Sequence, residues 1–332
     1  MTEIATKPAA DAHLFILLNA GSGHEATELQ KSTIEEVLTA AARRFTLTVI
    51  EDPARLEQLA EQMADKARES GGILVAAGGD GTINTVAGKA VDAGCTFGVL
   101  PQGTFNYFGR THGIPEDLGD AVRALLDASV QPVQVGMVND RIFLVNASIG
   151  LYPQILEERE ADKKQFGRSR LVALVSMVKT ALGAPQYLRI EMERDGKLQK
   201  MRTQMLFIGN NPLQIEQLGI APLTTALDNG KLVAIAPRSV GRLGMLALMV
   251  RGALGRLGDA SNLVAFGFRS LAVRQVTLYG KRKCIKVATD GEVTLIKTPL
   301  TFRVLEGQLL LLKPDAALPI EDRPDQTLQY AT

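Results

Sequence analysis

The fold is decided by the stretch Gly78-Gly79-Asp80-Gly81-Thr82-Ile83-Asn84. It follows an apolar run, 72–77, typical of a buried strand, and precedes residues 85–91, which are typical of a helix. Glycines let backbone N–H groups approach an anion, and a helix start adds unpaired N–H groups and a positive dipole end. A carboxylate beside phosphates is repulsive unless a cation lies between them. The stretch therefore predicts a nucleotide phosphate with Mg²⁺; the alternative is a tight turn in which Asp80 caps the helix.

The first third of the chain alternates between strand-like and helix-like patterns, which predicts a parallel, doubly wound α/β layer. Apolar or β-branched runs predict strands at 13–18, 45–50, 72–77 and 95–100. In such a sheet, ligands bind beyond the carboxyl ends of the strands.

Three of these four strands end in a glycine-rich turn. The first is Asn19-Ala20-Gly21-Ser22-Gly23, the second is the stretch at 78–84, and the third is Pro101-Gln102-Gly103-Thr104. Three such turns at one sheet edge predict a polyphosphate site. A complete dinucleotide fingerprint is missing after the first strand, so ATP is favoured over NAD.

Beyond about residue 130 the apolar pattern changes to period two, which predicts a mostly antiparallel β-sandwich. Hairpins are expected around Asn139-Asp140 and Asp195-Gly196. Further strands are expected at 201–208, 232–235, 272–278, 285–288 and 300–304. The expected organisation is a disordered lead (1–12), a nucleotide-binding α/β domain (13–130) and a β-sandwich domain for the second substrate (131–314), with 315–332 packing back on the first domain.

Composition excludes some classes of partner. The 332 residues carry a net charge of +1, so no global field attracts nucleic acid. Two cysteines without a disulfide framework, and a start without an apolar signal core, favour the cytoplasm. Basic and apolar segments at 163–182 and 240–257 suit peripheral contact with an anionic membrane surface, or equally a core-facing helix. A homodimer is possible.

The three turns, the third extended to Phe105-Asn106, and the later Asp290-Gly291-Glu292 together resemble the diacylglycerol kinase catalytic domain family. The resemblance is to its bacterial lipid-kinase branch, which is similar to sphingosine and ceramide kinases. NAD kinases and phosphofructokinases share the second turn with this family. The third turn narrows the resemblance to lipid kinases. The family implies an active site in the cleft between the α/β domain and the antiparallel domain. One departure is Tyr107, where many members have Asp.

The resemblance also implies roles for individual residues. Asp290 is the expected general base, with Glu292 as the other candidate. The residues expected to bind the nucleotide are Asn19, Ser22, Gly23, Gly78, Gly79, Asp80, Gly81, Thr82, Asn84, Gly103, Thr104 and Asn106. Asp80 is also the expected ligand of the catalytic Mg²⁺. A second, structural Mg²⁺ site is expected at Asp228-Asn229-Gly230, although an amide there replaces the family's second carboxylate.

The expected function is ATP-dependent phosphorylation of a lipid hydroxyl, on a diacylglycerol-like acceptor at the membrane surface. The expected location is cytoplasmic and peripherally membrane-associated. Two alternatives stay open: a kinase for a soluble acceptor such as NAD, and a lipid-binding or regulatory homologue without catalysis. Asn229 and Tyr107 are the features that favour the second alternative.

Overall fold

The computed structural model describes residues 6–21, 24–154, 156–157, 188–194, 197–217, 223–237, 268–273, 275–279 and 282–315. The segments expected to contact a membrane, 163–182 and 240–257, lie outside the described residues, as do Ser22 and Gly23. Residues 316–332 also lie outside them.

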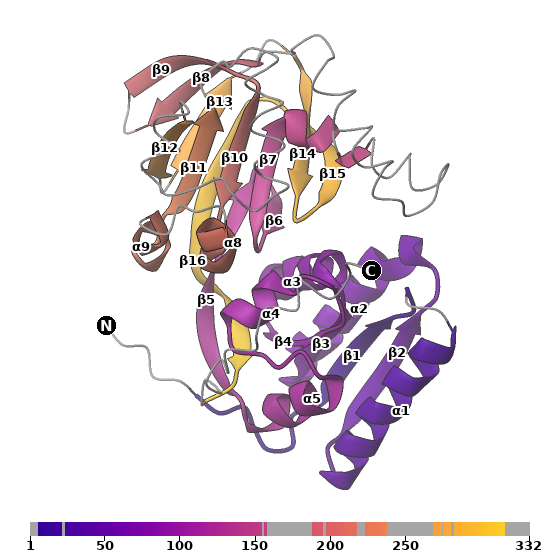
Figure 1. The fold of residues 1–332 in the computed structure, drawn as a ribbon. Helices are drawn as coiled ribbons and strands as arrows, with labels where there is room; N and C mark the ends of the chain where they lie inside the picture. Colours follow the sequence, from indigo (N-terminus) through magenta and orange to yellow (C-terminus); the bar gives the residue numbers. More distant parts are fainter. Residues whose placement is uncertain are drawn as a thin grey trace, which may run out of the picture.

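The first part of the chain is the expected α/β layer (Figure 1). Its strands are β1 (Leu14–Asn19), β2 (Phe45–Ile50), β3 (Ile73–Gly78) and β4 (Thr96–Pro101). They lie parallel in the order β2-β1-β3-β4. β3 is buried along its whole length, which explains why its sequence is a continuous apolar run rather than an alternating one.

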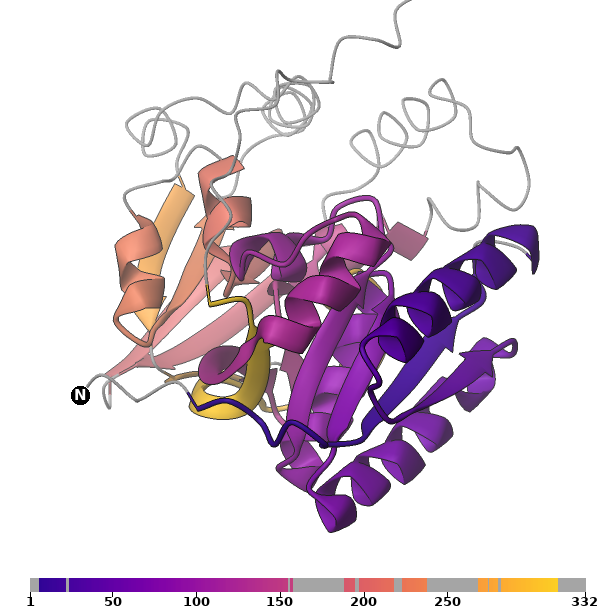
Figure 2. The same ribbon diagram turned by 90° about the horizontal axis from the view of Figure 1, so that it is seen from below.

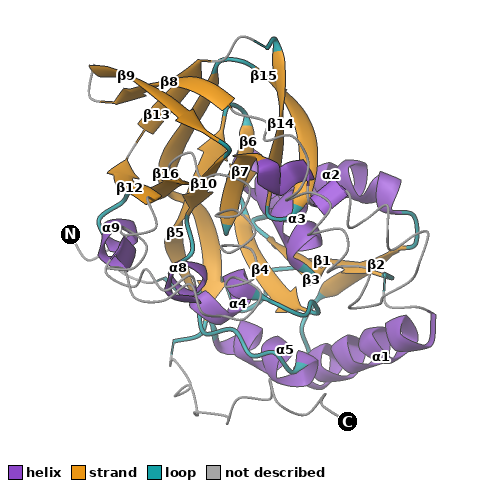
Figure 3. Cartoon of the chain, turned by 45° about the horizontal axis from the view of Figure 1, so that its top comes forward, coloured by secondary structure: helices purple, strands orange, loops and turns teal. Residues whose placement is uncertain are grey.

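Helices cover both faces of this sheet, so the layer is doubly wound (Figure 3). The helices are α1 (His24–Ala40), α2 (Leu56–Ser70), α3 (Asp80–Ala93), α4 (Tyr107–Thr111) and α5 (Leu118–Asp127), with a 3₁₀ turn at Pro53–Arg55. Helix α1 packs beside α5, and α2 packs beside α3. Both α2 and α3 end at a glycine in the left-handed conformation, Gly71 (φ 63°) and Gly94 (φ 67°), which is why each helix stops there.

The rest of the described chain is mostly antiparallel. Its strands are β5 (Ser129–Val138), β6 (Arg141–Phe143), β7 (Asn146–Gly150), β8 (Leu188–Arg194), β9 (Lys197–Thr203), β10 (Met205–Gly209), β11 (Leu232–Pro237), β12 (Phe268–Val273), β13 (Gln275–Tyr279), β14 (Cys284–Thr289), β15 (Glu292–Lys297) and β16 (Leu300–Lys313). Two short helices, α8 (Pro212–Gln217) and α9 (Thr224–Asp228), lie beside β10 and β11.

These strands form two layers with a shared core. One sheet has the order β12-β11-β10-β7-β14-β15, and the other carries β16, β13, β8 and β9. The buried cluster between them takes Val138, Val276 and Phe302 from one sheet and Ile149, Ile208 and Val287 from the other. Together with the parallel layer, this arrangement confirms the expected fold class.

Two long strands join the parallel layer to the antiparallel one. β5 and β16 pair with each other from Val138↔Phe302 to Ser129↔Lys313, with a shift in register between Leu305 and Leu309. The far end of β16 also pairs with β4, through Leu311↔Phe97. β16 therefore contributes to both layers, as Figure 1 shows, and the proposed division of the chain at residue 130 stays a prediction.

The structure corrects two of the expected strands. Residues 201–208 belong to β9 and β10, and 272–278 to β12 and β13, with each pair divided between the two sheets. Between the two strands of each pair the sequence has no turn signal. The apolar pattern alone therefore predicts one continuous strand in each place.

The structure also corrects the expected disordered lead, 1–12, over residues 6–12. Thr6 pairs with Val130 through backbone bonds of 2.8 and 3.4 Å, and Ala12 is buried. At the other end of the chain, Asp315 accepts a hydrogen bond from Ser129 and lies 3.4 Å from Lys7.

No helix in the described ranges is both long enough and apolar enough to cross a membrane.

A pair of phenylalanine substitutions tests the core between the sheets. Phe302 is fully buried, whereas Phe105 is 61% exposed. Phe302→Ala should lower the free energy of unfolding by about 3–5 kcal/mol, because it leaves a cavity. Phe105→Ala should cost less than about 1 kcal/mol. Chemical denaturation measures both; equal losses would contradict this assignment of the core.

Candidate active site

Two of the glycine turns meet at the start of α3. Gly79 precedes the helix in an extended conformation (φ −80°, ψ 178°), and Asp80 is the first helical residue. A Cβ atom on Gly103 would lie only 3.2 Å from Gly79 Cα, so the turns after β3 and β4 are in contact. The unpaired N–H groups and positive dipole end of α3 therefore point toward the carboxyl ends of the strands, where an anion can bind.

Asn19 and Thr82 hold the first turn against the second. Asn19 Nδ2 donates to Thr82 Oγ1 at 2.7 Å, and Asn19 Oδ1 accepts from the backbone N–H of Gly21 at 3.2 Å. Thr82 is buried, and a Cβ atom on Gly78 would lie 2.8 Å from Thr82 Cβ. These side chains tie the two turns together, and the direct nucleotide contact expected for Asn19 and Thr82 stays a prediction.

Asn106 has a similar role in the third turn. Its Oδ1 accepts from Gly103 N at 2.9 Å and its Nδ2 donates to Gly103 O at 2.7 Å, so both ends of the amide are used within the turn. Asn106 is buried and adopts a left-handed conformation (φ 46°). Thr104, by contrast, is exposed, and its hydroxyl has no hydrogen-bond partner within the described ranges. Thr104 thus presents an exposed hydroxyl group at this turn.

Asp80 is partly buried where these turns meet. Burial raises the pKa of its carboxyl group, while the backbone amides of Asn106, Tyr107 and Asp80 itself act in the opposite direction. Its Oδ1 atom is buried and has no hydrogen-bond partner among the residues that the structure describes. A buried carboxylate oxygen without a donor is a suitable ligand for Mg²⁺, which often takes only one or two protein carboxylates alongside nucleotide phosphates and waters. The residues present therefore fit a nucleotide-bound Mg²⁺.

The second expected metal site receives less support. Asn229 Nδ2 donates to Thr225 O at 2.6 Å, and Gly230 follows in a left-handed conformation (φ 65°) beside the side chain of Glu306. Across the described ranges, no group of three or more His, Cys, Asp or Glu side chains could hold a metal ion. A structural Mg²⁺ at Asp228 and Asn229 stays a prediction.

Asp290 joins three separate parts of the chain through its carboxylate. Its Oδ2 atom accepts from Leu144 N at 2.7 Å and from Asn84 Nδ2 at 2.5 Å. Its Oδ1 atom accepts from Val145 N at 2.9 Å and from Asn146 N at 2.8 Å. Four donors occupy the four lone-pair positions of an ionised carboxylate. The side chain therefore ties α3 to the β6–β7 connection and to the turn between β14 and β15.

The backbone of Asp290 is also fixed. It takes a left-handed conformation (φ 47°), and its N–H donates to Asn146 O at 2.9 Å. Burial raises the pKa of the Asp290 carboxyl group to about 6, against the lowering effect of the three backbone amides and Asn84. At neutral pH the group is thus ionised and fully hydrogen-bonded.

Glu292 begins β15 and differs from Asp290 in its exposure and in its hydrogen bonding. It is exposed, and its carboxylate makes no hydrogen bond or ion pair with a described residue. A Cβ atom on Gly81 would lie 2.7 Å from Glu292 Oε1, so this carboxylate rests on the first turn of α3. Partial burial raises the pKa of Glu292, and the charge of Arg141 lowers it.

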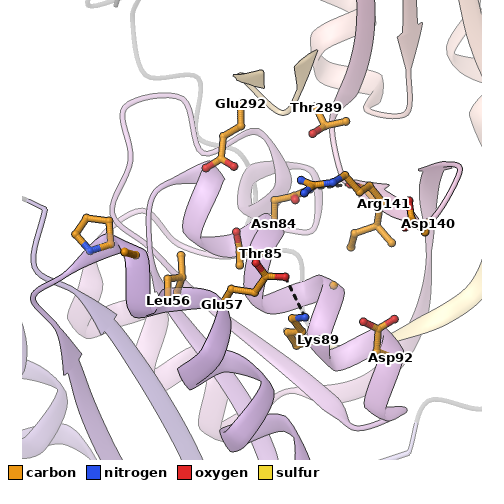
Figure 4. A pocket seen from close by; sticks show the side chains of 14 residues that line it. Leu56, Glu57, Asn84, Thr85, Lys89, Asp92, Asp140, Arg141, Thr289 and Glu292 are labelled. Atoms are coloured by element: carbon orange, nitrogen blue, oxygen red, sulfur yellow. Dashed lines mark hydrogen bonds and ion pairs between the residues drawn. The ribbon is translucent and has the colours of Figure 1, made fainter. Parts of the chain in front are cut away.

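A cavity of about 550 Å³ extends from Glu292 along α3 (Figure 4). Glu292 and Thr289 lie at one end, and the Glu57–Lys89 ion pair (3.2 Å) and Asp92 lie toward the other. Asn84, Asp140, Arg141 and Ile142 also line it. Both the α/β layer and the antiparallel strands thus contribute to its wall.

The sequence analysis did not single out several residues of this cavity. Glu57, Lys89, Asp92 and Arg141 belong to none of the glycine turns. The one signal available was the hairpin expected at Asn139-Asp140, which places Arg141 at the start of a strand. Of the residues that were expected in the site, Gly78, Gly79, Asp80, Gly81, Thr82, Asn84, Gly103, Thr104, Asn106, Asp290 and Glu292 all lie around the start of α3.

Comparison with known proteins identifies the first part of the chain. Residues 13–138 match the diacylglycerol kinase catalytic domain family. The match covers the three glycine turns, and it confirms the resemblance expected from them.

Relatives of the diacylglycerol kinase catalytic domain extend the similarity further along the chain. A protein of Staphylococcus haemolyticus that carries a lipid-kinase name is 25% identical over 285 residues, which is 84% of this chain and 89% of that protein. A diacylglycerol kinase of Staphylococcus aureus is 25% identical over 256 residues, 73% of this chain and 75% of that enzyme.

Solved structures of diacylglycerol kinases show the same fold. A crystal structure described as one of these enzymes from Bacillus anthracis superposes with a TM-score of 0.69 and 20% identity, and covers 96% of this chain and 99% of its own. A further structure from the same organism gives a TM-score of 0.63 at 18% identity. At these identities the likeness supports the fold alone.

Substitution of Asp290 tests its part in holding the site together. Asp290→Asn replaces one acceptor oxygen with a donor, so at least one N–H among its four partners loses its acceptor. The free energy of unfolding should fall by about 1–3 kcal/mol for each buried donor left unpaired. Glu292→Gln is the matched control, because no described residue bonds to that carboxylate, and it should change stability by less than about 0.5 kcal/mol. Chemical denaturation of both variants makes the comparison; an unchanged Asp290→Asn protein would contradict the geometry.

Proposed function

We propose that the chain is an ATP-dependent lipid kinase, which transfers the γ-phosphate to the hydroxyl group of a diacylglycerol-like acceptor. One observation carries this proposal: the carboxylate of Glu292, unpaired among the described residues, rests on the first turn of α3 and lines a polar cavity. The family of residues 13–138 and the names of the relatives support the reaction class.

The phosphates of ATP bind at the start of α3 in this proposal. The backbone amides from Gly79 to Gly81 face the anion, and the exposed hydroxyl of Thr104 donates to it from the neighbouring turn. The dipole of α3 stabilises the negative charge. Asn19, Thr82 and Asn106 keep the turns in shape through the hydrogen bonds described above.

The nucleoside then lies in the cavity along α3. From Gly81 to Lys89 the helix rises by about 12 Å, at 1.5 Å per residue. The lining contains six charged side chains, Glu57, Lys89, Asp92, Asp140, Arg141 and Glu292. Such a wall suits a ribose and a base, which form hydrogen bonds, better than an acyl chain, for which these charges would have to be desolvated.

Glu292 is the better candidate for the general base. A base must have a free lone pair within hydrogen-bond reach of the acceptor hydroxyl, and the oxygens of Asp290 already accept four hydrogen bonds. In the proposed step Glu292 takes the hydroxyl proton as the acceptor oxygen bonds to the γ-phosphorus, and the bond from that phosphorus to the departing ADP oxygen breaks. Asp290 positions Glu292 through the β14–β15 turn.

Asp80 would hold the Mg²⁺ that accompanies ATP, through its unpartnered Oδ1 atom. When bound, the ion supplies positive charge that offsets the charge of the phosphate oxygens. A structural Mg²⁺ at Asp228 and Asn229 is a further proposal with no additional support.

The acceptor is proposed to be reached from an anionic membrane surface on the cytoplasmic side. Both cysteines are free thiols, Cys95 buried and Cys284 exposed, which fits a reducing compartment. The segments expected to contact the lipid lie outside the described residues. The absence of nucleic-acid partners and a possible homodimer stay predictions.

Two alternatives predict different assay results. A kinase for a soluble acceptor such as NAD would work without vesicles, and a regulatory homologue would bind lipid without turning over ATP. The proposed function predicts transfer of label from [γ-³²P]ATP to lipid only when vesicles containing diacylglycerol are present. Equal transfer to NAD without vesicles, or binding without any transfer, would exclude the proposal.

The dependence of this activity on Glu292 gives a sharper test. Glu292→Gln should lower kcat by about 10²–10⁴-fold, which is the usual contribution of a general base, with little change in the affinity for ATP. The pKa of Glu292 is raised, so wild-type activity should fall as the pH is lowered. The midpoint of this fall should lie above the pKa of an ordinary glutamate. The direction follows from the base being active only when deprotonated. Wild-type kcat retained in Glu292→Gln would remove Glu292 as the base.

A further inference from the structure

Two cations line the cavity along α3, and they differ in how they are paired. Lys89 Nζ lies 3.2 Å from Glu57 Oε1, and the lysine side chain is 21% exposed. Arg141 makes no ion pair within the described ranges. Its closest described polar contact joins Nη1 to Thr294 Oγ1 at 3.5 Å, the outer limit of a hydrogen bond. Among the described residues, the guanidinium of Arg141 is therefore the cation of this cavity that has no anionic partner.

The backbone beneath Arg141 is firmly held. Arg141 opens β6 directly after the turn at Asn139, which adopts a left-handed conformation (φ 51°). Asn139 Oδ1 accepts from Thr301 N at 2.8 Å, and its Nδ2 donates to Lys297 O at 3.0 Å. Arg141 also pairs with Val138 across the hairpin. The side chain thus projects from a fixed point on the antiparallel part of the molecule.

The surroundings of Arg141 place it at the Glu292 end of the cavity. Figure 4 shows Arg141 beside Asn84, on the side of the cavity formed by Asp140 and away from the Glu57–Lys89 pair. Glu292 lies close enough for the charge of Arg141 to favour its ionised form. The two side chains nevertheless form no ion pair. The nitrogens of Arg141 therefore lie more than 4.0 Å from the carboxylate oxygens of Glu292.

The charge balance of the cavity makes an unpaired cation necessary for a phosphate ligand. Four acidic side chains and two basic ones line it, and Lys89 already forms an ion pair with Glu57. Phosphate oxygens would be repelled from most of the wall. They can be bound only where the amides of α3 and a free cation are both within reach, which is the end that carries Arg141.

We propose that Arg141 binds the terminal phosphate of the nucleotide across the cavity, opposite the amide groups at the start of α3. The inference rests on the proposed function and adds a specific residue to it. A guanidinium suits this task because its planar donors can bond two phosphate oxygens at once. It comes from the antiparallel part of the chain, so the phosphate is held between the two layers.

The same contact would act on the reaction. As the terminal phosphate leaves ADP, its charge is spread over the equatorial oxygens, and a guanidinium beside them stabilises that charge. Removing Arg141 should then weaken the binding of ATP more than that of ADP and should leave adenosine unaffected, because adenosine has no phosphate.

Calorimetric titration of the full chain tests this order of effects, at constant Mg²⁺ and without lipid. Arg141→Ala should weaken ATP binding by about tenfold to a hundredfold, as for a lost charge-assisted hydrogen bond. ADP binding should weaken by less than ATP binding, and adenosine binding should stay within about twofold. Arg141→Lys should recover only part of the loss, since an ammonium group is not a bidentate donor.

Arg282→Ala is the matched control. Arg282 is also exposed and makes no ion pair with a described residue, but it lies before β14 and does not line the cavity. The Arg282→Ala variant loses the same charge as Arg141→Ala. Unchanged ATP affinity in Arg282→Ala would show that the effect at Arg141 comes from a local contact and not from the overall charge of the protein.

The outcomes that overturn the inference are distinct from failure of the proposed function. ATP affinity within twofold of wild type in Arg141→Ala, or equal weakening of ATP and adenosine, would assign Arg141 no phosphate contact. If the wild-type chain binds ATP but transfers no phosphate to lipid, the kinase proposal fails while the contact of Arg141 stands. If the wild type does not bind ATP, both fail.

Discussion

The structure depends on one carboxylate. Asp290 accepts hydrogen bonds from Asn84 in α3 and from the backbone of Leu144, Val145 and Asn146. These contacts hold the β14–β15 turn against the start of the helix whose amides face the anion site. Without this carboxylate, each of the four donors would be partly buried and without an acceptor. The hydrogen bonds therefore favour one position of the turn relative to α3. Glu292, two residues further along the same turn, rests on Gly81.

Two acidic residues separated by a single glycine therefore take different tasks. Saturation with donors makes Asp290 a structural link, whereas the free lone pairs of Glu292 suit it to accept a proton. The same contrast recurs among the cations of the cavity. Lys89 is neutralised by Glu57, and Arg141 keeps its charge available. In both pairs the hydrogen-bond and ion-pair partners among the described residues, rather than the residue type, separate the side chain proposed to act on the substrates from the one proposed to support the structure.

Much of the α/β layer could be predicted because its signals are local. Continuous apolar runs mark strands buried on both faces, and the glycine turns follow them directly, so the strands, their parallel orientation and the sheet edge at which the turns lie could all be predicted. The contacts of Asp290 were not, because Asn84 and Leu144 are far from it in the sequence. For Asn19, Thr82 and Asn106, the pattern predicted positions in or beside the glycine turns but not the hydrogen bonds by which they tie those turns together.

The strands of the antiparallel part were harder to predict from the sequence, for a physical reason. β9 and β10, like β12 and β13, follow each other with almost no turn residues, yet they belong to different sheets. An apolar period of two is the same on both sides of such a crossing. Arg141, Glu57 and Lys89 gave no motif at all, since a cavity assembled from α2, α3 and β6 appears only once the elements are packed.

A crystal structure with Mg²⁺ and a non-hydrolysable ATP analogue tests the central claim most directly. It should show the terminal phosphate between the first amides of α3 and Arg141, with Glu292 facing it and Asp290 still bonded to Leu144, Val145 and Asn146. A structure in which Asp290 has left those amides and itself contacts the phosphate, or in which the analogue binds away from α3, would contradict the claim.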